Sequence, residues 1–69
     1  MAGIIGRNIT IYREKLGLTQ EQISRYLDKN LDTIRDYENG YLVVPMNVLV
    51  SLSHLYSIDA YDFLKKMEV

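Results

Sequence analysis

The chain contains no cysteine among its 69 residues, and this absence limits the ways in which it can fold. Disulfide bonds and cysteine zinc sites are excluded, and the single histidine, His54, cannot form a histidine metal cluster. A domain this small needs well-packed helices, a partner subunit, or both when it has no such cross-links. We therefore expect no metal and no cofactor, and the size argues against an enzyme.

The composition is that of a small folded domain. Hydrophobic residues make up 48% of the chain, and 8 basic residues balance 9 acidic ones for a formal charge of −1. This is too apolar and too neutral for a disordered chain. The longest apolar stretch, residues 41–46, is far shorter than a membrane span, and the N-terminus does not resemble a signal peptide. We expect one cytoplasmic domain over residues 1–69, with no membrane and no small-molecule ligand as partners.

The spacing of apolar residues predicts an all-α fold with five short helices. Ile5, Ile9, Tyr12 and Leu16 recur at intervals of three and four, which places them on one face of a helix that ends before Gly17. No segment shows the alternation of a strand. The predicted helices cover residues 5–16, 19–27, 31–39, 45–56 and 59–66.

Local signals mark where these helices begin and end. Thr19 and Gln22 have the spacing of a capping box at the start of the second helix. Asn30 is a good N-cap for the third helix, which stops before Gly40. Pro45 suits the first turn of the fourth helix, because a first-turn N–H has no partner there. The fourth helix carries an apolar stripe of Val48, Leu49, Leu52, Leu55 and Tyr56.

The last helix repeats the pattern of the second. Asp59 is its predicted cap, and Ile58 and Phe63 have the spacing of a hydrophobic staple across that cap. Lys65 and Lys66 close the helix, where positive charge is favourable.

The second and third helices, joined by the polar turn at residues 28–30, fit the helix-turn-helix plan over about residues 19–39. The surrounding sequence resembles the Cro and lambdoid-phage-repressor family of helix-turn-helix DNA-binding domains, in order and over roughly residues 4–64. The motifs that carry this resemblance are Ile5-Gly6-Arg7-Asn8-Ile9, Arg13, Gly17-Leu18-Thr19-Gln20-Glu21-Gln22-Ile23, Thr33-Ile34, Tyr37-Glu38-Asn39-Gly40, Leu52-Ser53, Tyr56-Ser57-Ile58-Asp59 and Phe63-Leu64.

The resemblance implies a compact five-helix fold like that of lambda repressor. It also implies a transcriptional regulator, acting as a repressor, that binds specific sequences of double-stranded DNA as a homodimer on a pseudo-palindromic operator. Arg13 and Glu38 match positions that form a partly buried ion pair in this family. Two unrelated surface charges are the alternative for these residues.

In this family the third helix contacts base edges in the major groove. The matching base-facing residues here are Leu31, Asp32, Arg35 and Asp36. The residues expected to contact phosphates, or either phosphates or bases, are Gln20, Lys29, Asn30, Thr33, Asn39 and Tyr41. Arg35 can read guanine through its two-pronged guanidinium. Asp32 and Asp36 depart from the family's usual Gln, Ser, Arg and Lys residues. A groove lined with phosphates repels the carboxylates of these two residues.

The loop after Gly40 is a second departure, because it is apolar where many relatives have basic residues. Leu42, Val43 and Val44 cannot all turn inward from so short a loop, and exposed apolar patches usually mark a partner site. We expect these residues in a dimer interface, with a loop folded over its own core as the alternative. The two departures also leave open another function, a protein-interaction module such as an antitoxin-like protein or co-regulator, with weak or no DNA binding.

Overall fold

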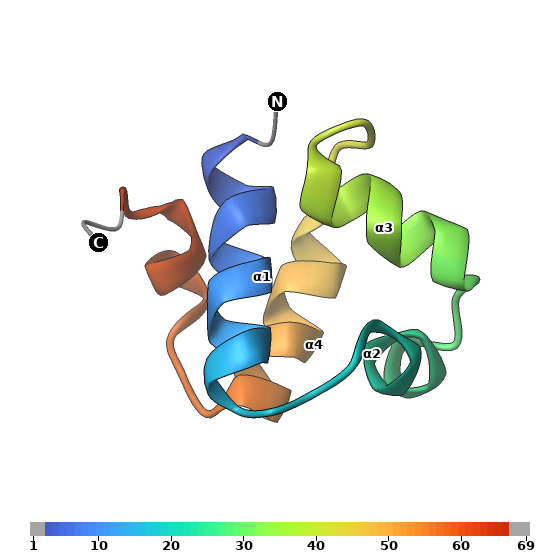
Figure 1. Cartoon of the computed structure of the whole chain (residues 1–69). Helices are drawn as coiled ribbons and strands as arrows, with labels where there is room; N and C mark the ends of the chain where they lie inside the picture. Colours follow the sequence, from blue (N-terminus) through green and yellow to red (C-terminus); the bar gives the residue numbers. More distant parts are fainter. Residues whose placement is uncertain (1–2, 67–69) are drawn as a thin grey trace.

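The computed structural model describes residues 3–66, which form four α-helices and one short 3-10 helix (Figure 1). In chain order the elements are α1 (Ile4–Lys15), α2 (Gln20–Leu27), α3 (Leu31–Asn39), α4 (Met46–Tyr56) and the 3-10 helix η1 (Ala60–Leu64). No strand occurs in these residues, so the all-α prediction is confirmed for them. Within residues 3–66, no helix is long and apolar enough to cross a membrane.

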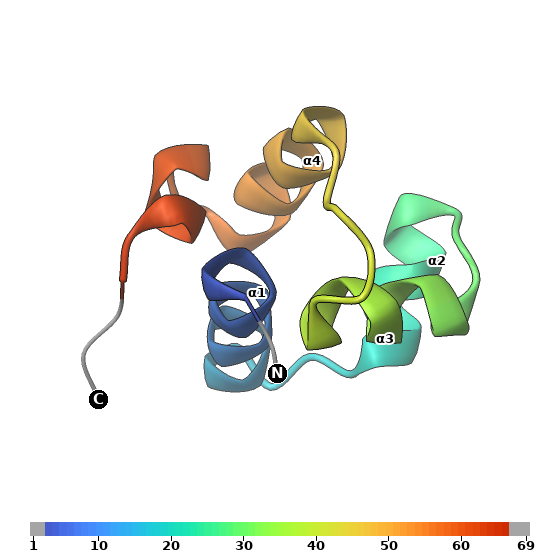
Figure 2. The ribbon, with the colours of Figure 1, turned by 90° about the horizontal axis from the view of Figure 1, so that it is seen from above.

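Helix α1 lies between η1 on one side and the α2–α3 pair on the other (Figures 1 and 2). It contacts both α3 and η1, while α2 packs on α3 and α4 packs on η1. Tyr12 of α1 also approaches Tyr56 at the end of α4, with 6.5 Å between their ring centroids. Helix α3 is therefore supported by α1 and by α2.

The core takes apolar side chains from every element. Its buried members are Ile9, Ile23, Ile34, Tyr37, Val48, Leu49, Leu52, Tyr56 and Phe63. The predicted stripe of α4 is confirmed, since Leu55 also packs against this core. Phe63 is fully buried, and its ring meets that of Tyr12 edge to face at 5.9 Å. Such aromatic pairs add about 0.5–1.5 kcal/mol beyond the area they bury, so even the short η1 is firmly held.

Most helix boundaries follow the local signals in the sequence. Thr19 Oγ1 accepts from the Gln22 main-chain N–H at 3.1 Å, and Gln22 Oε1 accepts from the Thr19 N–H at 2.7 Å. The predicted capping box is thus confirmed. Gly17 and Gly40 have φ of 71° and 79°, and Gly40 ends α3 as predicted. Asp28 ends α2 with φ of 54°, a left-handed conformation that aspartate tolerates better than most residues.

The prediction of a fifth α-helix is wrong, because Ala60–Leu64 form a 3-10 helix and Lys65 is already extended. The buried side chain of Asn8 explains this early end. Its Nδ2 donates to the main-chain oxygen of Phe63 at 2.7 Å and to that of Lys65 at 2.6 Å. These carbonyls therefore bond to α1, where a continuing helix would have used them itself. Asp59 caps the start of η1, as predicted.

Two smaller predictions need correction, and the prediction of Asn30 as an N-cap is confirmed with a different contact. Asn30 is the N-cap of α3, but only its main-chain oxygen takes part, by accepting from the Thr33 N–H at 3.0 Å. Pro45 stands one position earlier than predicted, as the N-cap of α4. Leu16 is half-exposed, because α1 ends at Lys15 and the chain turns away before Leu16 can face the core.

Helices α1 and α3 come close together at Gly6. A β-carbon at this position would lie 2.7 Å from the main-chain oxygen of Glu38 and still closer to that of Tyr37. Both oxygens belong to the backbone of α3, which cannot rotate away as a side chain can. The absence of a side chain at Gly6 thus sets the distance at which α1 supports α3.

Candidate nucleic-acid interface

Helices α2 and α3 are joined by three residues, as the helix-turn-helix plan requires (Figure 1). The Lys29 main-chain N–H donates to the Ser24 oxygen at 2.9 Å, which closes the end of α2. Ile23 of α2 and Ile34 of α3 are each only 1% exposed, so the two helices pack through apolar side chains on their inner faces. Helix α3 carries the four residues expected to contact base edges, which are Leu31, Asp32, Arg35 and Asp36.

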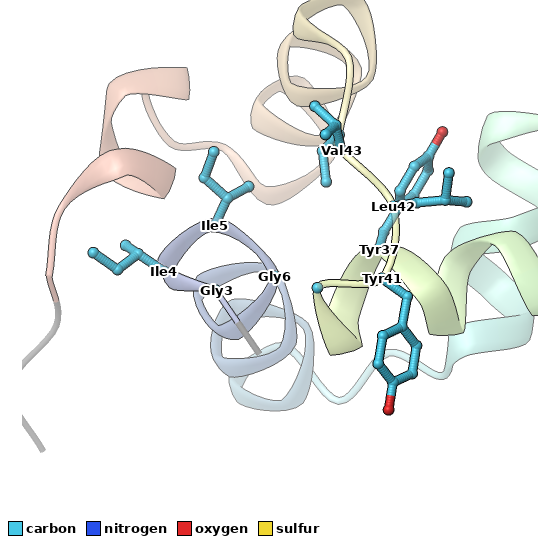
Figure 3. A pocket seen from close by; sticks show the side chains of 10 residues that line it. Gly3, Ile4, Ile5, Gly6, Tyr37, Tyr41, Leu42 and Val43 are labelled. Carbon is cyan, nitrogen blue, oxygen red and sulfur yellow. The ribbon is translucent and has the colours of Figure 1, made fainter. Parts of the chain in front are cut away.

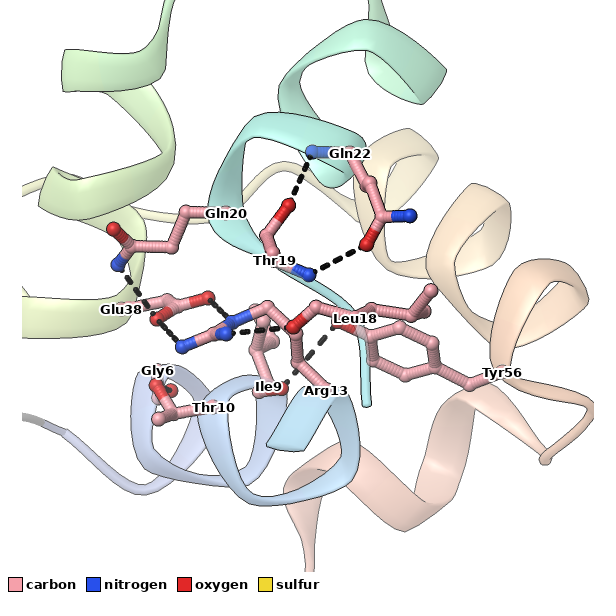
Figure 4. A network of polar contacts seen from close by, with 10 residues as sticks. All are labelled: Gly6, Ile9, Thr10, Arg13, Leu18, Thr19, Gln20, Gln22, Glu38 and Tyr56. Carbon is pink, nitrogen blue, oxygen red and sulfur yellow. Dashed lines mark hydrogen bonds and ion pairs between the residues drawn. The ribbon is translucent and has the colours of Figure 1, made fainter. Parts of the chain in front are cut away.

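A buried ion pair joins α1 to α3 behind this motif (Figure 4). Arg13 Nε donates to Glu38 Oε2 at 2.8 Å, and Arg13 Nη2 donates to Glu38 Oε1 at 3.1 Å. The two side chains are 12% and 4% exposed. Arg13 Nη1 also donates to the main-chain oxygen of Leu18 at 2.9 Å. The pair implied by the family resemblance is thus a two-pronged contact that also holds the segment entering α2.

Gln20 connects this ion pair to the first turn of α2. Its Nε2 donates to Glu38 Oε1 at 3.0 Å, so the Glu38 carboxylate receives donors from two elements (Figure 4). Hydrogen bonding to this carboxylate raises the pKa of Arg13, which keeps the guanidinium charged. The Gln20 amide therefore has a fixed partner inside the protein and retains one N–H for an outside ligand. The capping box leaves the main-chain N–H groups of Gln20 and Glu21 unused.

The residues expected to contact DNA differ in exposure. Those that are exposed are Lys29, Asn30, Asp32, Arg35, Asn39 and Tyr41. Those that are half-buried are Gln20, Leu31, Thr33 and Asp36. Leu31, Thr33 and Asp36 are thus partly covered by neighbouring helices, although all three are expected to contact DNA. Because α3 packs on both α1 and α2, its buried arc is wide and these residues lie at its edges.

Two of the exposed residues on α3 are paired with each other. Arg35 Nη1 lies 3.4 Å from Asp32 Oδ1, with the two side chains 54% and 90% exposed. The only other basic side chains on α2 and the turn are Arg25 and Lys29, and both are exposed. The positive charge available to a nucleic acid on this side of the molecule is therefore small, as the sequence indicates.

The loop between α3 and α4 leaves apolar surface exposed. Val43 is 89% exposed and Leu42 is 45% exposed, whereas Val44 packs against the core. An open groove of about 420 Å³ runs between this loop and the start of α1, with Ile5 and Gly6 on its far side (Figure 3). The expectation that some of this loop stays exposed is confirmed. Val44 itself faces inward, so it presents little surface to a partner.

Sequence reasoning missed the role of Asn8. This residue is 1% exposed and holds η1 to α1 through the two hydrogen bonds described above. A signal was present, because Asn8 lies three residues after Ile5 and four before Tyr12, on the same face of the helix. A search for the spacing of apolar residues alone does not detect a buried polar side chain such as the Asn8 amide. The contact between Gln20 and Glu38 carries no comparable signal, because it depends on how α2 and α3 pack.

The sequence model of the helix-turn-helix family, of the Cro and phage-repressor type, matches residues 9–63. The chain belongs to this family. The matched range contains α2, the turn and α3, together with both members of the ion pair, Arg13 and Glu38. The resemblance stated from the sequence is confirmed, and helix-turn-helix proteins of this type are DNA-binding regulators. No curated protein and no solved structure matches this helix-turn-helix chain.

Proposed function

We propose that this helix-turn-helix protein is a transcriptional regulator that binds specific sequences of double-stranded DNA. It acts as a repressor, as a homodimer on a pseudo-palindromic operator. The observation that carries the proposal is the outer face of α3, which is held by α1 and α2 and presents Asp32 and Arg35 to solvent. A helix held in this way fits the major groove, where its N-terminal residues meet base edges.

The contacts divide into two groups. Base edges are read by Leu31, Asp32, Arg35 and Asp36, and phosphates or bases are contacted by Gln20, Lys29, Asn30, Thr33, Asn39 and Tyr41. Gln20 is well suited to a phosphate, because the N–H groups at the start of α2 favour an anion there. The affinity is expected to fall as salt rises with a modest slope, since each phosphate neutralised by Lys or Arg contributes about −0.9 and this side of the molecule has few cations.

Selection of bound sequences from random duplex DNA, followed by a salt titration on the best sequence, tests this function. We expect one preferred sequence and an affinity that falls as salt rises. Arg35→Ala is expected to relax base preference, and Gln20→Ala is expected to weaken binding to all sequences alike. Thermal unfolding of the Gln20 variant is the control, because Gln20 also contacts Glu38. If no duplex binds even at low salt, DNA binding is excluded.

The homodimer is proposed from the exposed loop. Leu42 and Val43 offer apolar surface that a symmetric partner can cover, and the loops of two copies would then meet near the two-fold axis. The two α3 helices would reach half-sites about one helical turn, roughly 34 Å, apart.

Sedimentation of Val43→Glu against Tyr61→Glu tests the dimer, because both side chains are largely exposed but Tyr61 lies on η1. We expect the Val43 variant to sediment as a monomer and the Tyr61 variant to behave as the wild type. Equal behaviour of the two variants would argue against an interface at the loop.

A protein-interaction module is the second candidate, and it is favoured by the acidic side chains of Asp32 and Asp36 on α3 and by the apolar loop at residues 42–44. The double substitution of Asp32 and Asp36 by Asn separates the two functions. Non-specific DNA affinity should rise if α3 enters a groove, because two negative charges are removed. A protein-interaction module that binds through this face of α3 should instead lose affinity for its protein partner in the double variant.

A further inference from the structure

The ion pair between Asp32 and Arg35 has no evident role in folding. The residues stand three apart on α3 and face away from the buried Ile34 and Tyr37. The Arg35 side chain is 54% exposed and that of Asp32 is 90% exposed, with 3.4 Å between Arg35 Nη1 and Asp32 Oδ1, so the pair is an ordinary surface contact. Exposed ion pairs of this kind contribute little to the free energy of unfolding, so these two side chains are available to contact a ligand of α3.

We propose that Asp32 and Arg35 read DNA as one unit. In this unit Asp32 orients the Arg35 guanidinium toward a guanine and itself accepts a hydrogen bond from the amino group of a neighbouring cytosine. The inference rests on the proposed DNA-binding function and adds the base step that α3 recognises. It also assigns Asp32, an acidic residue on α3, a function in base recognition.

The donors and acceptors of the two side chains allow both contacts at once. A guanidinium has five N–H donors in a rigid plane, so one donor held by Asp32 Oδ1 leaves a neighbouring pair for N7 and O6 of guanine. The carboxylate of Asp32 keeps Oδ2 free, and the amino group of cytosine is the base-edge donor that a carboxylate accepts from. A guanidinium already oriented by Asp32 also loses less freedom when it binds.

The charges support the same arrangement. An isolated Asp32 would be repelled by the phosphates on both sides of the groove, whereas the pair with Arg35 is neutral as a whole. Asp36 is half-buried, and within residues 3–66 the Arg35 guanidinium pairs with Asp32 and not with Asp36. Asp32 is thus the carboxylate that the geometry couples to Arg35.

The test measures base preference at each position of the selected sequence for the wild type, Asp32→Ala, Arg35→Ala and the double variant. We expect the wild type to require a guanine and a nearby cytosine. Asp32→Ala should lose the cytosine preference and lower the guanine preference by about fivefold or more. The double variant should show no guanine loss beyond that of Arg35→Ala, because the two residues act together. Asp32→Asn should shift the preference from cytosine toward adenine.

Glu14→Ala is the matched control, since it removes one exposed negative charge from α1 without touching α3. It should leave both base preferences unchanged. If Asp32→Ala instead strengthens binding to all duplexes and keeps the guanine preference, Asp32 is only a repelled charge and the inference is overturned. If the wild type binds no duplex at all, the proposed function itself fails, which is a different result.

Discussion

Removing the carboxylate of Glu38 is the sharpest test of how the helix-turn-helix motif is held together. Glu38→Leu leaves the Arg13 guanidinium without its partner at a site where that side chain is only 12% exposed. Breaking a buried pair costs about 3–5 kcal/mol. Because the edge of Arg13 still reaches water, we expect the lower end, about 3 kcal/mol.

The loss is large beside the stability that a chain of this size can have. At about 0.05–0.15 kcal/mol per residue, a domain of this length is stable by roughly 3–10 kcal/mol. A loss of about 3 kcal/mol lowers the Tm by about 12–24 °C in such a domain. Thermal and urea unfolding, followed by circular dichroism, measures this directly.

Two further variants make the prediction specific to a buried pair. Arg13→Met combined with Glu38→Leu removes both charges, and an apolar replacement of a buried pair is often neutral or stabilising. The double variant should therefore recover most of the stability that Glu38→Leu loses. Arg35→Ala, which breaks the exposed pair with Asp32, should cost less than about 1 kcal/mol. The reasoning is refuted if Glu38→Leu costs no more than Arg35→Ala, or if the double variant is less stable than either single one.

Three other variants test individual positions of the fold. Gly6→Ala should lower stability by about 1–3 kcal/mol in thermal unfolding, because its β-carbon would meet main-chain oxygens of α3, while Gly3→Ala, with open space around it, should not. Burial raises the pKa of Tyr56 above its ordinary value of 10.0, so the neutral hydroxyl contributes stability that is present below about pH 10 and is lost as the pH rises further. Urea titrations at about pH 8 and about pH 11 should show a smaller loss for Tyr56→Phe than for the wild type; an equal loss would exclude Tyr56 as the cause. Asp28→Gly should raise the urea midpoint by relieving up to about 1 kcal/mol of left-handed strain, and an unchanged or lower midpoint would contradict this.

Features set by a few neighbouring residues were predictable from the sequence. The capping box at Thr19 and the left-handed conformations of Gly17 and Gly40 depend on contacts within one turn of the chain, so residue type and spacing determine them. The apolar stripe of α4 was predictable for a similar reason, because one buried face repeats every three or four residues.

Features that join distant parts of the chain were not predictable in the same way. The sequence offered a cap and a staple for the last helix, which favoured an α-helix, but the amide of Asn8, 55 residues away from Phe63, ends it early. The ion pair between Arg13 and Glu38 was inferred from the family resemblance, and its link to Gln20 emerged only from the packing of α2 on α3. At the candidate interface, residue type indicated which side chains can meet DNA, whereas their exposure depends on two neighbouring helices.

The attachment of η1 to α1 has a consequence for when the domain can form. Asn8 and Tyr12 are synthesised well before the groups they bind or contact, which are the carbonyls of Phe63 and Lys65 and the ring of Phe63. At about 5–20 residues per second, translation of the intervening chain takes roughly 3–11 s. During that interval the inward face of α1 lacks these partners, so the packing of α1, the helix that supports α3, is completed only after η1 has been synthesised.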